Sequence, residues 1–177
     1  MAVRGCNGYL RWGVMRYRVV HLLKGPLGAR ETLSLDTGPY TLGEDLVVQS
    51  LRGALTLVRI HNGLLASGRL TVELEVECIR CLTPFPLTLA VEIEDLLFLS
   101  PSSHQPGILY HVTEGGWIDL TPALREYVLL SIPWRPLCRP DCRGLCSQCG
   151  QNLNEGSCSC AVEAIDPRLS QLQALLS

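Results

Sequence analysis

Cysteine is the residue type in this sequence whose spacing points most clearly to chemistry. Six of the nine cysteines lie between Cys138 and Cys160. Zn²⁺ prefers four thiolate or imidazole ligands in a tetrahedron, and Cys146-Ser147-Gln148-Cys149-Gly150 has the Cys-x2-Cys spacing that directs two sulfurs at one ion. The glycine after the pair can adopt the positive φ that such a turn needs. The sequence therefore predicts a zinc site with ligands drawn from Cys138, Cys142, Cys146, Cys149, Cys158 and Cys160.

A single four-cysteine site needs a second pair beside this Cys-x2-Cys turn. Cys158 and Cys160 are the preferred pair, because residues 152–157 are polar, contain a glycine and can turn the chain back. Cys138 and Cys142 compete for the same role. The spacing alone leaves this choice open.

Two more cysteines lie much earlier in the chain, at Cys78 and Cys81. With Cys138 and Cys142 they would form a second four-cysteine site, which leaves only Cys6 unassigned. Alternatively, Cys78 is a small core side chain, because it is in phase with the apolar residues before it and free cysteines are often buried. A thioredoxin-type redox pair fits less well, because that pair opens a helix and this one ends a predicted strand.

The N-terminal region bears on the choice between zinc and disulfides. Disulfides need an oxidising compartment, yet the acid-free residues 1–30 contain no apolar run as long as that of a secretory signal. No stretch approaches the roughly 18 apolar residues of a spanning helix. We therefore expect a soluble, cytoplasmic protein that does not enter membranes, with Met15 as an alternative start that leaves residues 1–14 as a loose extension.

Composition limits the possible functions. The chain has 177 residues, is 47% hydrophobic and has a formal net charge of -2, which suits one domain with a core and a small additional module but not a general nucleic-acid binder. No nucleophile elbow or phosphate-binding loop is present in the sequence, and its four histidines are isolated. We expect no catalytic residues and no small-molecule substrate.

Alternation of apolar and polar residues predicts an antiparallel β-meander. From Leu64 to Cys78 every second residue is apolar or small, with acids between them, which is typical of a half-buried strand. His61-Asn62-Gly63 is a turn signal, so Leu46 to Ile60 should pair with this strand. A third strand is predicted from Leu87 to Ile93, after Thr83-Pro84-Phe85-Pro86, which we expect not to continue a ladder. Two further strands are expected at Gly28 to Leu35 and at Ile108 to Val112.

One helix is predicted after the meander, and a shorter one at residues 168–176. Thr121 is a good N-cap, Pro122 suits the first helical position and Pro133 ends the helix. Arg125 and Glu126 should face solvent. The apolar side of the helix comprises Leu120, Leu124, Tyr127, Val128 and Leu130.

These elements indicate an α+β fold. We expect an antiparallel sheet, able to curl toward an open barrel, with one packed helix and a C-terminal zinc-binding module. The predicted domains are a loose extension over residues 1–14, a sheet and helix domain over residues 15–134, and a Cys-rich module with a short helix over residues 135–177.

Four motifs together resemble a known family. They are Leu22-Leu23-Lys24-Gly25-Pro26-Leu27-Gly28, Cys78-Ile79-Arg80-Cys81-Leu82-Thr83-Pro84-Phe85, Asp119-Leu120-Thr121, and the block from Pro136 to Asn154 with its four cysteines. Over about residues 15–170 the chain resembles the YceD family of large ribosomal RNA subunit accumulation proteins. The resemblance implies a non-catalytic cytoplasmic factor, with a plastid branch in plants, that is needed for normal levels of large-subunit ribosomal RNA.

The resemblance also bears on the two early cysteines. Some members of the family lack the C-terminal cysteines but keep the counterparts of Cys78 and Cys81, which implies that zinc is not the whole function. An alternative function is a thiol- or zinc-dependent redox protein or enzyme that uses these two cysteines.

Acidic residues predict one interaction surface. Glu73, Glu75 and Glu77 alternate along the exposed side of the second strand. The hairpin register that we expect places Glu73 across from Glu92, with Glu94 beside them, and like charges in opposed positions destabilise a sheet. Such a face should bind a basic partner, for example a ribosomal protein; otherwise it is simply solvated.

Arginines near the cysteines predict a second surface. Guanidinium groups can contact the phosphates of a large-subunit ribosomal RNA precursor. Alternatively these residues belong to a solvated loop, because Asp141 and Glu155 dilute their charge. The arginines concerned are Arg80, Arg135, Arg139 and Arg143.

Overall fold

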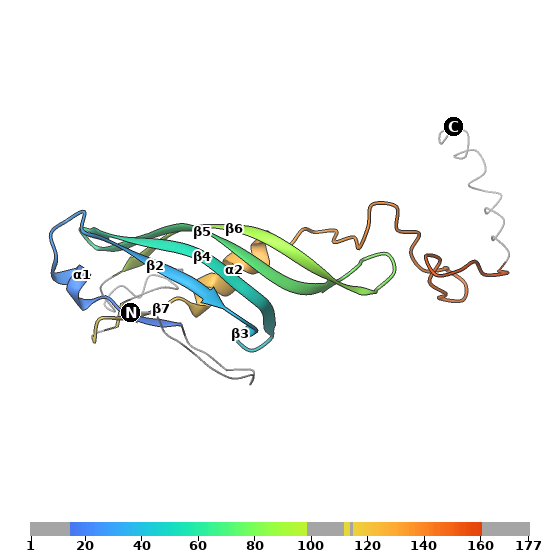
Figure 1. Ribbon diagram of the computed structural model, residues 1–177, viewed down its shortest axis with the longest axis horizontal. Coiled ribbons are helices and arrows are strands. Elements are labelled where there is room, and N and C mark those ends of the chain that lie inside the picture. Colours follow the sequence, from blue (N-terminus) through green and yellow to red (C-terminus); the bar gives the residue numbers. More distant parts are fainter. Residues whose placement is uncertain (1–14, 99–111, 114, 161–177) are drawn as a thin grey trace, which may run out of the picture.

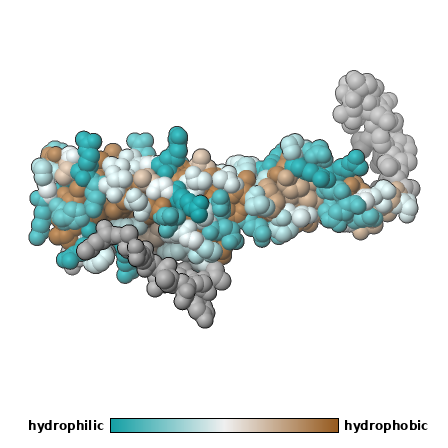
Figure 2. Space-filling view, viewed as in Figure 1, coloured by the Kyte–Doolittle hydropathy of each residue, from teal (hydrophilic) through white to brown (hydrophobic). Residues whose placement is uncertain are grey.

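The computed structural model describes residues 15–98, 112, 113 and 115–160. Figure 1 shows an elongated molecule, with a long twisted sheet at one end and the cysteine-rich segment at the other. Figure 2 shows hydrophilic residues along the whole length of the same face. The elements are β1 (Arg16–Arg18), α1 (Val20–Lys24), β2 (Arg30–Thr37), β3 (Tyr40–Leu42), β4 (Leu46–Ile60), β5 (Gly63–Glu77), β6 (Pro84–Phe98), β7 (Trp117–Asp119) and α2 (Thr121–Ser131).

The main sheet has five antiparallel strands in the order β2-β4-β5-β6, and β3 also pairs with β4. This confirms the predicted meander, and β4 has the predicted bounds. In the described part of the chain the sheet is open rather than barrel-like, because its edge strands β2 and β6 do not pair with each other. A small second sheet of β1 and β7 accompanies α2.

The predicted alternation of β5 is confirmed by burial. Leu64, Leu70 and Val72 have no exposed surface, and they pack with the helical residues Leu124 and Val128 in one core. The opposite face of β5 carries the exposed, mostly charged residues. The helix α2 thus covers one face of the sheet and leaves the other to solvent.

The start of α2 differs from the prediction in its cap. Thr121 is the first helical residue, and Leu120 is at the N-cap position without a side-chain cap. As a helical residue Thr121 is not at the cap position, and its hydroxyl accepts a hydrogen bond of 2.8 Å from the backbone N–H of Met15. Instead, the carboxylate of Asp119 accepts the Thr121 N–H at 2.9 Å.

The far end of α2 was only partly predicted. The helix ends at Ser131, two residues before Pro133, as a proline requires. Leu130, expected on the buried side, is 77% exposed. The physical reason is geometric: Leu130 is two residues after Val128 and six after Leu124, so its side chain points away from the side of the helix on which these two residues are buried.

Four short elements were not predicted from the sequence, namely α1, β1, β3 and β7. Three of them are strands of three residues, too short for periodicity to reveal. Of the strand predicted at residues 108–112, only Val112 is described, and it belongs to no strand. The helix predicted at residues 168–176 lies outside the described residues.

The register of the β5–β6 hairpin differs from the prediction by four residues. The turn spans Cys78 to Thr83, closed by a 3.1 Å hydrogen bond from the Cys78 N–H to the Thr83 carbonyl. Pro84 and Pro86 therefore continue the ladder as part of β6. This is possible because β6 is an edge strand and both prolines occupy positions whose nitrogen points away from β5.

The corrected register separates the acidic residues. Glu73 pairs with Thr88 and not with Glu92, while Glu92 faces Arg69 and forms an ion pair with it. Glu94 faces Ser67. The predicted opposition of like charges across the hairpin is therefore wrong: the acids of each strand are close to one another along that strand, but they do not face acids across the pair.

The end of the β5–β6 hairpin extends beyond the rest of the sheet. Strand β4 pairs with β5 only as far as Leu74, which faces Val48. Residues 75–86 therefore form a two-stranded projection, which we call the arm. Figure 1 shows the arm reaching toward the cysteine-rich segment. The arm carries Cys78 and Cys81 away from the main core.

Candidate metal centres

Eight cysteines form two groups of four. The inner group comprises Cys78, Cys81, Cys138 and Cys142; the outer group comprises Cys146, Cys149, Cys158 and Cys160. Within each group all four sulfur atoms lie within 4.8 Å of one another. This is the two-site arrangement that the sequence left as an alternative, so Cys138 and Cys142 do not compete with Cys158 and Cys160.

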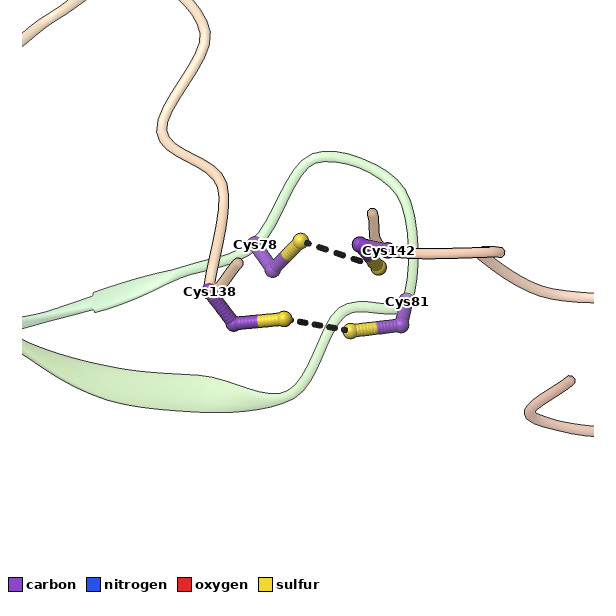
Figure 3. Close-up of side chains that lie close together, drawn as sticks. All are labelled: Cys78, Cys81, Cys138 and Cys142. Atoms are coloured by element: carbon purple, nitrogen blue, oxygen red, sulfur yellow. Dashed lines mark hydrogen bonds between the residues drawn. The ribbon is translucent and has the colours of Figure 1, made fainter. Parts of the chain in front are cut away.

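The sulfur separations fit zinc and not disulfides. In the inner group the Cys78 and Cys142 Sγ atoms are 3.8 Å apart, and those of Cys81 and Cys138 are 3.7 Å apart (Figure 3). A tetrahedron with Zn–S bonds of about 2.3 Å has sulfurs roughly 3.8 Å apart, whereas a disulfide bond is about 2 Å long. The described cysteines are free thiols, and four sulfurs at this spacing are a donor set that suits Zn²⁺.

The inner group joins two distant parts of the chain. Figure 3 shows Cys78 and Cys81 on the turn of the arm, with Cys138 and Cys142 reaching it from the segment after α2. The Ile79 N–H donates to the Pro136 carbonyl at 3.0 Å and holds this segment beside the turn. Side chains of Phe85, Leu137 and Leu145 pack around the sulfurs, and Cys78 is fully buried.

The outer group is built by a second tight turn. The Gly150 N–H donates to the Cys146 carbonyl at 2.9 Å, and the Cys146 N–H donates to the Gln151 carbonyl at 2.8 Å. Gly150 has a φ of 72°, as the Cys-x2-Cys-Gly pattern predicted. Cys149 is exposed, while the other three cysteines of the group are half-buried. Solvent therefore reaches the outer group more readily than the inner one.

The two Cys-x2-Cys turns have the same backbone geometry with different residues. In the inner turn the Leu82 N–H donates to the Cys78 carbonyl at 2.8 Å, just as Gly150 donates to Cys146. Leu82 takes the left-handed conformation, with a φ of 56°, where the outer turn has glycine. A non-glycine residue there costs on the order of 1 kcal/mol, which the surrounding contacts must offset.

Hydrogen bonds hold the outer turn in place. The Leu145 N–H donates to the Arg80 carbonyl of the arm at 3.1 Å, and within the module the Leu153 N–H donates to the Gly144 carbonyl at 2.9 Å. The side-chain amide of Asn154 lies 3.3 Å from the Cys142 sulfur, as a donor that would stabilise a metal-bound thiolate. Sequence reasoning missed Asn154, although its place four residues after Gly150 of the cysteine-glycine turn was a usable signal.

Each group contains thiols of lowered pKa beside thiols of raised pKa. Burial raises the pKa of Cys78, but backbone N–H donors of Cys138, Cys81 and Arg80 outweigh it and lower the pKa to about 6. Burial and the neighbouring thiols raise the pKa of Cys138 to about 12. The Cys78 thiolate is therefore favoured at neutral pH, and metal binding must displace the proton of Cys138.

The outer group shows the same contrast. Backbone N–H donors of Cys149 and Gln148 lower the pKa of Cys146 to about 6. The hydrogen bond with Cys149, together with burial, raises the pKa of Cys160 to about 12. A bound cation would lower the pKa values of all four thiols in each group and so favour four thiolates.

Metal retention should therefore fall as the pH falls through about 6. The lowered pKa values of Cys78 and Cys146 keep these thiolates available above that pH, and protonation removes them below it. We expect a chelator of fixed concentration to leave zinc bound at neutral pH and to remove it increasingly below about pH 6. Zinc retention that does not change between neutral pH and about pH 5 would contradict this expectation.

Two of the four arginines near the cysteines are used within the structure. Arg80 donates from its guanidinium to the Cys142 carbonyl at 2.9 Å. Arg139 donates to the side-chain oxygen of Asn154 at 2.7 Å and lies 3.7 Å from the Asp141 carboxylate. These contacts hold the module together, so neither guanidinium is fully available to an external anion.

The other two arginines remain available. Arg143 donates its backbone N–H to Asn154 at 2.8 Å, but its guanidinium has no protein partner among the described residues. Arg135 is exposed on the segment that leads from α2 to the inner group, and the described part of the chain offers its guanidinium no partner either. The predicted arginine cluster thus reduces to two free guanidinium groups.

The acids of β5 form a column that ends at the arm. Glu73 accepts a hydrogen bond of 2.9 Å from the Ser50 hydroxyl. Glu75 and Glu77 face Pro86 and Pro84 across the hairpin, so no described cation opposes them. We call Glu73, Glu75 and Glu77 the acidic column. It is exposed along its whole length and points away from the core.

The tertiary environment also bears on the other readings of Cys78. Its neighbours are the sulfurs and side chains of the inner group, and it is not part of the main core cluster. The Cys78–Cys81 pair lies in a hairpin turn, and no helix begins at it. These observations weaken both the interpretation of Cys78 as a core side chain and its interpretation as part of a thioredoxin-type redox pair.

Neither α1 nor α2, the helices of the described residues, has the length and apolar character needed to span a membrane.

The sequence is similar to a known family and to several bacterial and plant proteins. Residues 66–176 match the family model described as large ribosomal RNA subunit accumulation protein YceD. An uncharacterised protein of Mycobacterium tuberculosis is 32% identical over 150 residues, which cover 82% of this chain and 67% of that protein. No solved structure matches significantly.

Plant and other bacterial relatives extend the comparison. A chloroplastic protein of Zea mays named large ribosomal RNA subunit accumulation protein YCED homolog 1 is 25% identical over 138 residues, covering 60% of this chain and 47% of that protein. An uncharacterised protein of Bacillus subtilis is 28% identical over 105 residues, covering 59% of this chain and 61% of that protein. The family match spans the arm and both cysteine groups. The chain therefore belongs to the YceD family of large ribosomal RNA subunit accumulation proteins.

Proposed function

We propose that this protein supports the accumulation of large-subunit ribosomal RNA during ribosome assembly in the cytoplasm. It does so as a non-catalytic binding factor whose module holds two zinc ions. The proposal is supported by family membership and by the names of the plant relatives. Residues 15–134 form the framework, residues 135–177 form the module and residues 1–14 are an extension.

The composition of the two cysteine groups supports the proposal that the protein is not a catalyst. Each group offers four sulfur ligands, which fill a tetrahedral shell around zinc. Catalytic zinc sites instead keep one position open for water or substrate. Both ions would therefore be structural: the inner one fastens the module to the arm, and the outer one stabilises the exposed turn.

The acidic column supports a basic protein as one partner. Its three carboxylates recur at every second residue, about 7 Å apart along an extended strand. Each zinc bound by four thiolates adds a net charge of -2 near the end of the arm. A basic ribosomal protein would gain favourable electrostatic contacts along this end of the molecule, and its association would be accelerated.

The test is complementation of a strain in which the gene has been deleted. We expect the deletion to lower the ratio of large-subunit to small-subunit ribosomal RNA and the natural protein to restore it. Replacing Glu73, Glu75 and Glu77 with lysine should abolish capture of a basic ribosomal protein and reduce the restored ratio, because the column then repels its partner.

A matched control reverses the same number of acids elsewhere. Glu31, Asp36 and Glu44 lie away from the arm on β2 and the β3–β4 turn, so changing them to lysine alters net charge equally. This control should still capture the ribosomal protein. A column variant that captures it as well as the natural protein would show that the column is only solvated. An unchanged ribosomal RNA ratio in the deletion strain would refute the proposed function itself.

A further inference from the structure

Trp134 is the most exposed large hydrophobic side chain among the described residues, at 99% exposure. Tryptophan is normally mostly buried, because it has the largest apolar surface of any side chain. It follows α2 and lies four residues before Cys138 of the inner group. Figure 1 shows the segment after α2 running toward the module. An aromatic ring displayed fully to solvent at a defined position is suited to contact a partner.

The segment around Trp134 is held in a restricted conformation. It lies in the sequence Pro133-Trp134-Arg135-Pro136, where each proline fixes its own φ and restricts the residue before it to extended geometry. The Pro136 carbonyl accepts the Ile79 N–H at 3.0 Å, which ties the segment to the turn of the arm. Cys138 then anchors the chain in the inner group. A backbone segment that is already restrained loses less conformational freedom on binding.

The charged residues next to Trp134 in the chain are basic and not acidic. Between Glu126 and Asp141 the chain contains no acidic residue. Arg135 directly follows Trp134 and its guanidinium has no partner among the described residues, whereas Arg139 is occupied within the module. A basic protein would be repelled by Arg135, so the acidic column and Trp134 suit different partners.

We propose that Trp134 and Arg135 form a base-stacking site for single-stranded RNA. The indole would stack on an unpaired base, and the Arg135 guanidinium would contact the adjacent phosphate. Stacking must supply most of the affinity, because the nearby thiolate groups and the net charge of -2 give no strong long-range attraction for RNA. This inference rests on the proposed function and identifies RNA as a direct partner.

The test measures binding of the full-length, zinc-loaded protein to a short, labelled single-stranded RNA of mixed sequence. Trp134→Ala should weaken binding by about 5- to 150-fold, the loss expected for one base–aromatic stack, and Trp134→Phe should weaken it less. Arg135→Gln should reduce the slope of log K against log salt by about 0.7, the value for one phosphate contact on a single strand. Zinc content should be unchanged in all three variants.

Leu130→Ala is the matched control, because Leu130 is 77% exposed on the same stretch of chain but cannot stack. It should bind RNA like the natural protein. The proposal is overturned if the natural protein does not bind the RNA, or if Trp134→Ala binds it equally well. If Trp134→Ala loses ribosomal-protein capture but binds RNA as before, the proposal is also overturned, because Trp134 would then contact a protein and not RNA.

The complementation assay separates this inference from the proposed function. We expect Trp134→Ala to restore the large-subunit ribosomal RNA ratio only partly. If it restores the ratio fully while the deletion strain remains low, the stacking site is wrong and the proposed function stands. If the deletion strain has a normal ratio, the proposed function fails whatever the RNA-binding result.

Discussion

Protein purified under reducing conditions with zinc available is expected to carry two zinc ions per chain. The two groups of four sulfurs are separate, and the sulfur spacing in the inner group is that of tetrahedral zinc. Cys78→Ser should remove one ion and Cys146→Ser the other, because the two residues belong to different groups. Metal analysis of the natural protein and both variants measures this directly.

The two variants should differ in what they unfold. Structural zinc contributes on the order of 10 kcal/mol of apparent folding free energy, so its loss unfolds whatever it alone holds. Loss of the inner ion should release the module from the arm and make the segment between Ile132 and Cys138 sensitive to proteases. Loss of the outer ion should affect only the turn around Cys149, while β4 and β5 persist in both variants.

Cys6→Ser provides the control, because the eight described cysteines already supply four sulfurs to each group. It should retain both ions. One ion per chain, lost equally in Cys78→Ser and Cys146→Ser, would mean that the eight cysteines share a single site. Absence of zinc from protein handled anaerobically throughout would mean that the cysteines are not a zinc centre at all.

Substitution of Gly68 is expected to disrupt the centre of the sheet. Gly68 in β5 faces Leu55 in β4, and a Cβ atom there would overlap the Ala54 carbonyl oxygen and lie 3.0 Å from the Leu55 Cα. These are backbone atoms of a paired strand, so they cannot move aside as a flexible side chain could. We expect Gly68→Ala to lower the free energy of unfolding by about 3 kcal/mol or more.

Urea denaturation of the two proteins measures this difference. A loss of this size is a large fraction of the roughly 5–15 kcal/mol that stabilises a typical domain, so Gly68→Ala should unfold at a much lower urea concentration. Gly38→Ala is the control, because a Cβ at Gly38 would meet no atom within 4 Å and Gly38 does not have a left-handed φ. A Gly68→Ala protein as stable as the Gly38→Ala control would contradict the close approach of β4 and β5 seen here.

Structural features that depend only on residues close together in the chain were predicted correctly from the sequence. The two-residue alternation in β5 and the turn at residues 61–63 determined two long strands and their pairing, because one face of each strand must be buried. The Cys-x2-Cys-Gly turn at Cys146 was equally local, since it needs only a positive φ at Gly150. Pro122 and Pro133 similarly marked the two ends of α2.

The hairpin register depended on information that the local pattern does not contain. Prolines normally interrupt a ladder, so Pro84 and Pro86 were expected to lie outside the strand. Whether a proline fits depends on whether its nitrogen faces a neighbouring strand, and only the tertiary structure shows that β6 is an edge. The four-residue difference removed the predicted opposition of Glu73 and Glu92 and left the acidic column on β5 alone.

The sequence by itself determined which cysteines could bind metal, because thiolate type and short spacing are local properties. It did not determine their division into two groups. Cys78 and Cys142 are 64 residues apart, and their sulfurs meet only because the arm projects beyond β4 to where the chain returns from α2. Metal ligands must converge in space, so the long-range path of the backbone decides which short cysteine pairs share an ion.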